Sequence, residues 1–339
     1  MTNLCKIAAI GLLLSAPLAR ANVALFLEEP HGAFGGMNPT GHAAIYLSSV
    51  CADSLTSLRF CQPGELGVVI SRYHRIGGFD WIAIPLMPYL YAVNSAEQVP
   101  DEVSVEDVAA LRDEYRRKNL EEIAPDQLDG SAPKGDWTQL VGASYDRAIY
   151  SFELKTTTDQ DSRFIDAFNS RRNKADFNLL FHNCADFARH AINFYYPGAV
   201  HRSLIGDLGI MTPKQAAKSL LQYTKKNPSL EVASVVIPQI PGTVPRSAPV
   251  RGVLESFLKS KRYIVPLMPL AVLYPYFGGS LAVAWMEDGR FNPRRLAAAE
   301  GPATEPALIG QKLESNPVFR PPMMLAGPRK SPAGPQTAE

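Results

Sequence analysis

The chain has 339 residues, with 34 basic and 33 acidic side chains and a formal net charge of +1. Its hydrophobic content of 46% is typical of a globular protein. Because there is no basic excess, the composition gives no indication of a nucleic-acid partner. The length is sufficient for one large domain with appendages, or for two domains.

The first 21 residues have the three parts of a secretory signal peptide. Lys6 supplies the positive start, residues 7–14 form the apolar centre, and Ala19-Arg20-Ala21 is a small-x-small cleavage site. Cys5 precedes the apolar centre, so it is not placed as a lipoprotein cysteine. We therefore expect a mature chain that begins at Asn22 and is exported to the periplasm or cell envelope.

Three cysteines remain after the signal peptide: Cys51, Cys61 and Cys184. Cys51 and Cys61 are close in a loop-like stretch, and an oxidising compartment favours a disulfide between them. Cys184 is then the odd thiol, as expected of a nucleophile. Beyond a loose grouping of Cys184 with His182 and His190, no set of side chains has metal-ligand spacing. We expect neither a metal nor another cofactor.

The first half of the chain is predicted to form strands and one charged helix. We expect strands at residues 23–27, 41–47, 66–73 and 79–85. Residues 48–64, which hold the first two cysteines, are expected to be a loop. Ser104 starts the charged helix, within an insertion at about 101–124.

The second half is predicted to contain one strand and several helices. We expect the strand at 145–154 and helices at 158–172, 213–226 and 250–262. The helix at 213–226 follows Thr212 as N-cap and has Pro213 at its first position. Residues 238–250 are rich in proline and mark a boundary.

Residues 263–286 contain no charged side chain over 24 positions, which is long enough to span a bilayer. However, the segment carries Pro266, Pro269, Pro275 and the pair Gly278-Gly279. A membrane span and an apolar segment packed on the globular domain therefore both remain open. The tail from 291 to 339 is rich in Pro and Ala, and we expect it to be disordered.

Residues 178–189, NLLFHNCADFAR, contain the unpaired cysteine. From Phe187, apolar residues recur at three- and four-residue spacing until Pro197-Gly198, which predicts a helix that begins at Cys184. A thiol in the first turn of a helix is favoured as a thiolate, so we expect a pKa well below the ordinary value. The alternative interpretation is a buried structural cysteine.

A cysteine nucleophile needs a base. Of the six histidines, His182 and His190 are close in sequence but poorly aimed by the strand and helix they are predicted to occupy. His31 and His201 are in loops. His42 starts a strand behind Gly41, and we predict that it is the base.

The order of these motifs resembles the circularly permuted NlpC-type papain-like fold, which includes lecithin:retinol acyltransferase-like proteins. The resemblance rests on Gly41-His42-Ala43-Ala44-Ile45-Tyr46, followed much later by Asn183-Cys184-Ala185-Asp186-Phe187, and covers about residues 23–198. It implies an α+β fold with an antiparallel sheet packed on the Cys184 helix. It also implies that Cys184 is the nucleophile and His42 the general base.

The family's third group is a polar residue that orients the base from the adjacent strand. In an antiparallel pair the start of one strand faces the end of the next, which indicates Ser71, Tyr73 or His74. We choose His74. The backbone N–H of Cys184 would supply one donor to an oxyanion.

The resulting domain assignment is a signal peptide (1–21), a permuted papain-like catalytic domain (22–230), an extension (231–290) and the tail (291–339). The expected function is an exported thiol hydrolase that attacks an amide bond in peptidoglycan peptides. Acyl transfer or deacylation of lipids, with membrane association through 263–286, is one alternative because the same thioester mechanism serves both. A non-catalytic envelope binding protein on the same fold is the other.

Overall fold

The computed structural model describes residues 21–32, 39–74, 76–204, 206–259 and 291–295, together with single positions between 265 and 286. The expected signal peptide up to residue 20 and the tail beyond residue 295 lie outside this part. Among the described residues, no helix has both the length and the apolar character needed to cross a membrane.

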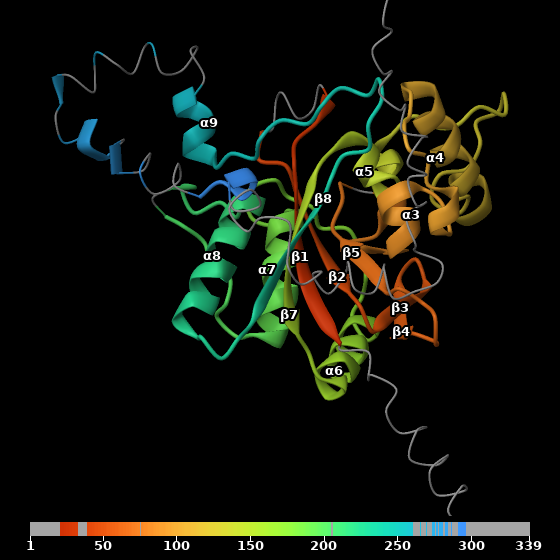
Figure 1. Ribbon diagram of the computed structural model, residues 1–339, viewed down its shortest axis with the longest axis horizontal. Helices are drawn as coiled ribbons and strands as arrows, with labels where there is room; N and C mark the ends of the chain where they lie inside the picture. Colours follow the sequence, from red (N-terminus) through yellow and green to blue (C-terminus); the bar gives the residue numbers. More distant parts are fainter. Residues whose placement is uncertain are drawn as a thin grey trace, which may run out of the picture.

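A six-stranded antiparallel sheet in the order β6-β5-β2-β1-β7-β8 forms the centre of the molecule (Figure 1). Its strands are β1 (Asn22–Glu28), β2 (His42–Leu47), β5 (Val68–Ser71), β6 (Ile82–Pro85), β7 (Ile149–Lys155) and β8 (Val232–Ile237). The predicted α+β class with an antiparallel sheet is confirmed. β8 was not predicted. It pairs with β7, so the sheet continues past the boundary expected at residue 230.

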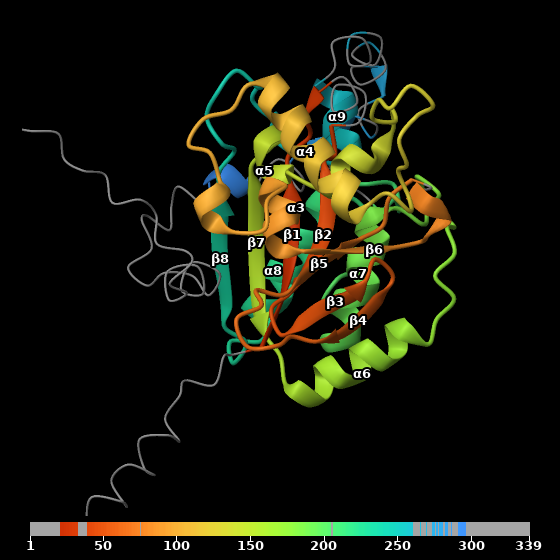
Figure 2. The same cartoon turned by 90° about the vertical axis from the view of Figure 1, so that its right-hand side faces the viewer.

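Helices cover both faces of the sheet. One face carries α6 (Thr158–Asn169), α7 (Cys184–Tyr195) and α8 (Pro213–Lys226); the other carries α3 (Leu86–Tyr91), α4 (Val105–Asn119) and α5 (Ala143–Asp146) (Figures 1 and 2). In β1, Leu25 packs with the α6–α8 layer and Phe26 with the α3–α5 layer. Because both faces are covered, β1 reads as a continuous apolar run rather than as an alternating one.

The expected insertion at 101–124 is part of this layering. Val108, Tyr115 and Leu120, in and just after α4, are buried in the core on the α3–α5 face. Ser104 caps α4 as predicted and exchanges hydrogen bonds with Asp107 in a capping box. Thr212 likewise caps α8, ahead of Pro213. A last helix, α9 (Val253–Lys259), lies within the predicted range 250–262.

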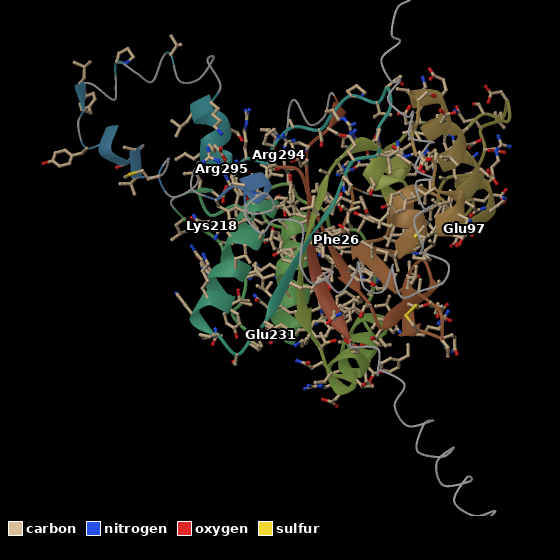
Figure 3. All side chains as sticks on the ribbon, viewed as in Figure 1. Phe26, Glu97, Lys218, Glu231, Arg294 and Arg295 are labelled. Carbon is tan, nitrogen blue, oxygen red and sulfur yellow. A yellow bond between two sulfur atoms is a disulfide. The ribbon has the colours of Figure 1, made fainter. Side chains whose placement is uncertain are left out.

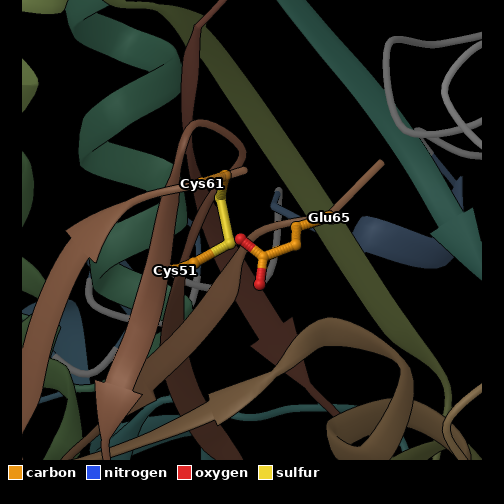
Figure 4. Close-up of side chains that lie close together, drawn as sticks. All are labelled: Cys51, Cys61 and Glu65. Atoms are coloured by element: carbon orange, nitrogen blue, oxygen red, sulfur yellow. A yellow bond between two sulfur atoms is a disulfide. The ribbon is translucent and has the colours of Figure 1, made fainter. Parts of the chain in front are cut away.

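The expected loop at 48–64 is instead a hairpin of β3 (Val50–Ser54) and β4 (Ser57–Phe60). The predicted disulfide between Cys51 and Cys61 is present and ties this hairpin together (Figure 4). Glu65 lies beside the bridge, and its carboxylate accepts two hydrogen bonds of 2.7 Å from Arg59. Because the sulfurs are bonded to each other, they do not offer thiolates to a metal.

Candidate functional site

Asn183 fixes the position of Cys184 at the start of α7. Its side-chain oxygen accepts from the N–H groups of Ala185 at 2.9 Å and Asp186 at 3.0 Å, as an N-cap should. Its amide donates to the carbonyl of Met211 at 2.9 Å, in the loop before α8. The two cap bonds do not use the N–H of Cys184 itself.

The segment before Asn183 differs from the prediction. Asn178 and His182 bond each other across a tight turn rather than extending a strand, because no strand of the described residues pairs with them. The turn leaves Leu179, Leu180 and Phe181 exposed. These apolar side chains therefore lie directly beside the start of α7.

His42 starts β2 because Gly41 allows the backbone to approach β1. Gly41 has a φ of 75°, and a Cβ there would lie 2.1 Å from the carbonyl oxygen of Glu28. No other residue fits without moving one of the two strands. The close approach sets His42 directly opposite Glu28 in the β1–β2 register.

Ser71, the last residue of β5, holds the imidazole. Its Oγ lies 2.8 Å from Nε2 of His42 and also donates to the carbonyl of Ala43 at 2.8 Å. A hydroxyl has one proton, so Nε2–H must be the donor to Ser71. The lone pair of the neutral ring then lies on Nδ1, where a base needs it.

The sulfur of Cys184 contacts the backbone N–H of Ala43, the residue after His42. The register between β2 and β5 ends at Ile45 and Ile70, so this N–H lies beyond the ladder. By alternation, His42 is on the α3–α5 face, whereas α7 packs on the other face. Cys184 and His42 thus reach the open end of β2 from different elements, the start of α7 and the start of β2.

Tyr73 packs against His42 at the open end of β2. Its ring stacks on that of His42 with the centroids 5.0 Å apart. Burial raises the pKa of the Tyr73 hydroxyl, and the negative charge of Glu28 raises it further. Tyr73 thus contacts the face of the His42 ring, whereas Ser71 bonds its Nε2 atom.

The pKa values differ from the expectation of a low-pKa thiol. Burial raises the pKa of Cys184 to about 11, although the N–H groups of Ala43 and of the helix start favour the thiolate. Burial also holds the pKa of His42 well below its ordinary value, and Arg147 and His31 lower it further. At pH 7 the resting pair is therefore a neutral thiol and a neutral imidazole.

His74 does not take the predicted position beside His42. If the β2–β5 register is extended, Tyr73 falls opposite His42, and alternation places Ser71 and Tyr73 on its face. His74 follows on the other side of the chain, is exposed, and lies 3.9 Å from Asp136. The residue that bonds the imidazole of His42 is Ser71.

His182, His190 and His201 lie apart from His42, whereas His31 is close enough to lower its pKa. His182 is exposed and lies 3.8 Å from Asp176, and His190 contacts Arg189 on the exposed side of α7. His201 follows Val200 in a loop and is also exposed.

Sequence reasoning missed a buried charged network behind His42. Glu28 is fully buried, accepts a hydrogen bond from Tyr89, and lies 3.1 Å from the guanidinium of Arg147. Burial raises the pKa of Glu28 and outweighs the opposite effect of Arg147. Two consecutive glutamates directly after an apolar strand were the signal that could have indicated it.

Comparisons with known protein families, with curated protein sequences and with solved structures find no match to this chain.

Proposed function

We propose that the chain is an exported thiol hydrolase in which Cys184 attacks a carbonyl carbon and His42 is the general base. The observation that supports this most directly is the hydrogen bond between Ser71 and Nε2 of His42, next to the Ala43 N–H that the sulfur contacts. Because this bond places the imidazole proton on Nε2, Nδ1 of His42 can accept a proton. The unpaired thiol of Cys184 is at the same end of β2.

The proposed reaction has two halves. Nδ1 of His42 takes the thiol proton as the sulfur of Cys184 bonds to the carbonyl carbon, and the N–H of Cys184 stabilises the oxyanion. The C–N bond then breaks, the imidazolium returns the proton to the leaving amine, and a thioester remains. Water, deprotonated by His42, hydrolyses the thioester and releases the acid.

Because Cys184 and His42 are both neutral before substrate binds, the proposed reaction uses general-base catalysis rather than a preformed thiolate–imidazolium pair. The raised pKa of Cys184 disfavours nucleophilic attack in the absence of a base. Transfer to His42 requires the two side chains to meet beyond the Ile45–Ile70 pair, where the ladder is open. Closure around a substrate would favour that contact.

The proposed substrate is an amide in peptidoglycan peptides. A lipid acyl group is the second candidate, favoured by the exposed Leu179, Leu180 and Phe181 beside the start of α7. An acyl lipid would form the same thioester with Cys184. A non-catalytic binding protein on this fold is the third, favoured by the raised pKa of the thiol.

The test is to trap the acyl-enzyme. The protein is incubated separately with purified muropeptides and with a phospholipid, and quenched in acid, and mass spectrometry then looks for an acyl adduct on the peptide that carries Cys184. Cys184→Ala and His42→Ala should each abolish turnover, and the double variant should be no worse than either single variant. His182→Ala and His190→Ala are matched controls that should retain activity.

The outcomes separate the three candidates. Turnover of muropeptides alone supports the amidase, and an adduct from the lipid alone supports acyl transfer. If neither substrate reacts and an electrophilic acyl probe leaves Cys184 unmodified at pH 8, the hydrolase proposal is wrong and the non-catalytic candidate is favoured.

A further inference from the structure

The two edge strands of the sheet differ in what covers their outer edges. On β6, the N–H of Ala83 donates to the carbonyl of Leu55, in the turn of the β3–β4 hairpin, at 2.9 Å, and the strand ends at Pro85. On β8, no strand among the described residues pairs with the outer edge. Figure 2 shows β8 at this side of the sheet, and in Figure 3 Glu231 marks its start. β8 is therefore the edge that is open to a further strand.

The backbone bonds of β7 show which residues of β8 face outward. At one end of β7 the N–H of Glu29 donates to Ala148 at 3.1 Å, and at the other end the N–H of Thr156 donates to Ala21 at 2.8 Å. The even-numbered residues of β7 therefore bond β1, and the odd-numbered ones bond β8. Their partners in β8 are Ala233, Val235 and Ile237. The residues whose N–H and C=O groups point outward are Val232, Ser234 and Val236.

β8 lacks the charges, prolines and bulges that protect many edge strands. Its sequence, VASVVI, has no charged side chain and no proline, and it pairs with β7 residue for residue. No backbone group among the described residues bonds the three outward N–H groups. Val236 is 41% exposed, although it lies on the face of the sheet that α6, α7 and α8 cover. The edge thus presents both unpaired backbone groups and an apolar side chain.

The outward groups of β8 match a second copy of β8 in one antiparallel register. With Ser234 opposite Ser234 of the second copy, Val232 lies opposite Val236, and every outward residue is in a hydrogen-bonded pair. Moving the centre of the pair to residue 235 places Pro238, which has no N–H, opposite Val232. Moving it to residue 233 places Leu230 opposite Val236, and the N–H of Leu230 is already bonded within the chain. The register centred on Ser234 therefore satisfies the most backbone groups.

We propose that two copies of this chain associate through the outer edges of β8, as an antiparallel pair of strands centred on Ser234. The two sheets then form one continuous sheet, and Val232 of each copy covers the exposed Val236 of the other. No charged side chain of one β8 faces another across this pair, so no repulsion opposes it. Because a single strand pair is smaller than the interface of a permanent dimer, we expect a dimer that dissociates on dilution.

The first experiment measures association by sedimentation over a range of protein concentrations. The dimer fraction of the parent should rise with concentration. Val236→Lys places a charge on the edge, as natural edge strands do, and should raise the dissociation constant of the dimer at least about 10-fold. Leu128→Lys, at a fully exposed leucine in the loop after α4, is the matched control and should associate like the parent. Equal association of Val236→Lys and the parent would overturn the proposal.

The second experiment determines the register by disulfide cross-linking in a Cys184→Ser background. Ser234→Cys should give a covalent dimer on mild oxidation, because Cα atoms about 5.5 Å apart in a hydrogen-bonded pair lie within disulfide range. Val232→Cys and Val236→Cys should each fail to cross-link alone, but the two proteins mixed should cross-link to each other. Cross-linking of Val236→Cys alone as fast as that of Ser234→Cys would indicate random collision and overturn the proposal.

Other occupants of the edge give different results. If the parent stays a monomer at every concentration but a variant that ends at residue 295 dimerises, the chain's own C-terminal residues cover the edge and the proposal is wrong. A parent and a shortened variant that are both monomers would also overturn it. Cys184→Ala should associate like the parent, since the strand pair does not involve the candidate site, so failure of the proposed hydrolase and failure of association are distinguishable.

Discussion

Cys184 begins α7 and His42 begins β2, and burial keeps both side chains neutral. The helix start favours a thiolate, but the desolvation of the sulfur outweighs it. The neutral imidazole has its basic nitrogen free because Ser71 fixes the tautomer. At the scale of single residues, the proposed attack by Cys184 would therefore require proton transfer during the attack rather than a thiolate at rest.

The raised pKa of Cys184 predicts a thiol that reacts slowly at neutral pH. The rate of iodoacetamide modification should keep rising above the ordinary thiol pKa of about 8.5, toward the value of about 11 that burial imposes. Mass spectrometry of the Cys184 peptide from pH 6 to 10.5 measures this, with Cys184→Ser as the blank. A rate that reaches its plateau below pH 7 would contradict the prediction and restore the thiolate expected from the sequence.

Ser71 is predicted to be a positioning residue for His42. Ser71→Ala removes the acceptor of the Nε2 proton and leaves a buried donor unpaired, so the tautomer is no longer fixed. We expect kcat to fall about 10- to 100-fold with little change in KM. His74→Ala is the control, because its side chain is exposed, and Ser71→Thr should recover part of the loss. Equal activity of Ser71→Ala and the parent would remove Ser71 from the site.

At the scale of elements, four hydrogen bonds of the Asn183 side chain fix the start of α7. Asn183 joins the first turn of α7 to the 178–182 turn, through Leu179, and to the loop before α8, through Met211. The same residue thus supports both the helix and the loops that surround the thiol.

Loss of this cap should be visible in both stability and reactivity. Asn183→Ala removes two acceptor bonds and two donor bonds, and we expect the free energy of unfolding to fall by about 1–2 kcal/mol. Asn183→Asp keeps the acceptor and should cost less. Thermal unfolding followed by circular dichroism compares the two. Equal losses for Asn183→Asp and Asn183→Ala would mean that the two donor bonds, which both variants lose, dominate over the cap.

At the scale of the whole molecule, buried charges gather at the end of the sheet where β1 ends and β2 begins. Glu28 pairs with Arg147, and Asp146 pairs with Arg112 at 2.5 Å and lies 3.7 Å from His31. Such pairs contribute specificity of arrangement more than net stability, because desolvation offsets much of the attraction. They also make the molecule sensitive to acid.

The stability of the protein should fall as pH is lowered from 6.5 toward 4. Burial lowers the pKa of His31 to about 4, and Arg147 and Arg112 act in the same direction against Asp146. The unfolded chain therefore binds the proton first, and stability is lost as pH falls through this window. Thermal unfolding should show a shallower decline for His31→Gln, by about 1–3 kcal/mol at pH 4. Parallel curves for the two proteins would exclude His31 as a cause.

The sequence by itself determined the elements whose signals are local. The caps Ser104 and Thr212 fixed two helix starts, and the apolar spacing after Cys184 predicted α7, because neighbouring residues alone satisfy a helix. The disulfide followed from cysteine number and spacing. Gly41 indicated the close approach of β1 and β2.

The tertiary structure decided what depends on partners distant in sequence. The pairing of β2 with β5 made Ser71 and not His74 the partner of His42, since strand register is set by tertiary packing. β8 is an edge strand with weak burial, so its own residues gave no clear pattern. The pKa of Cys184 depends on the depth of burial, which no local pattern encodes, and for that reason the thiolate predicted from a helix start became a neutral thiol.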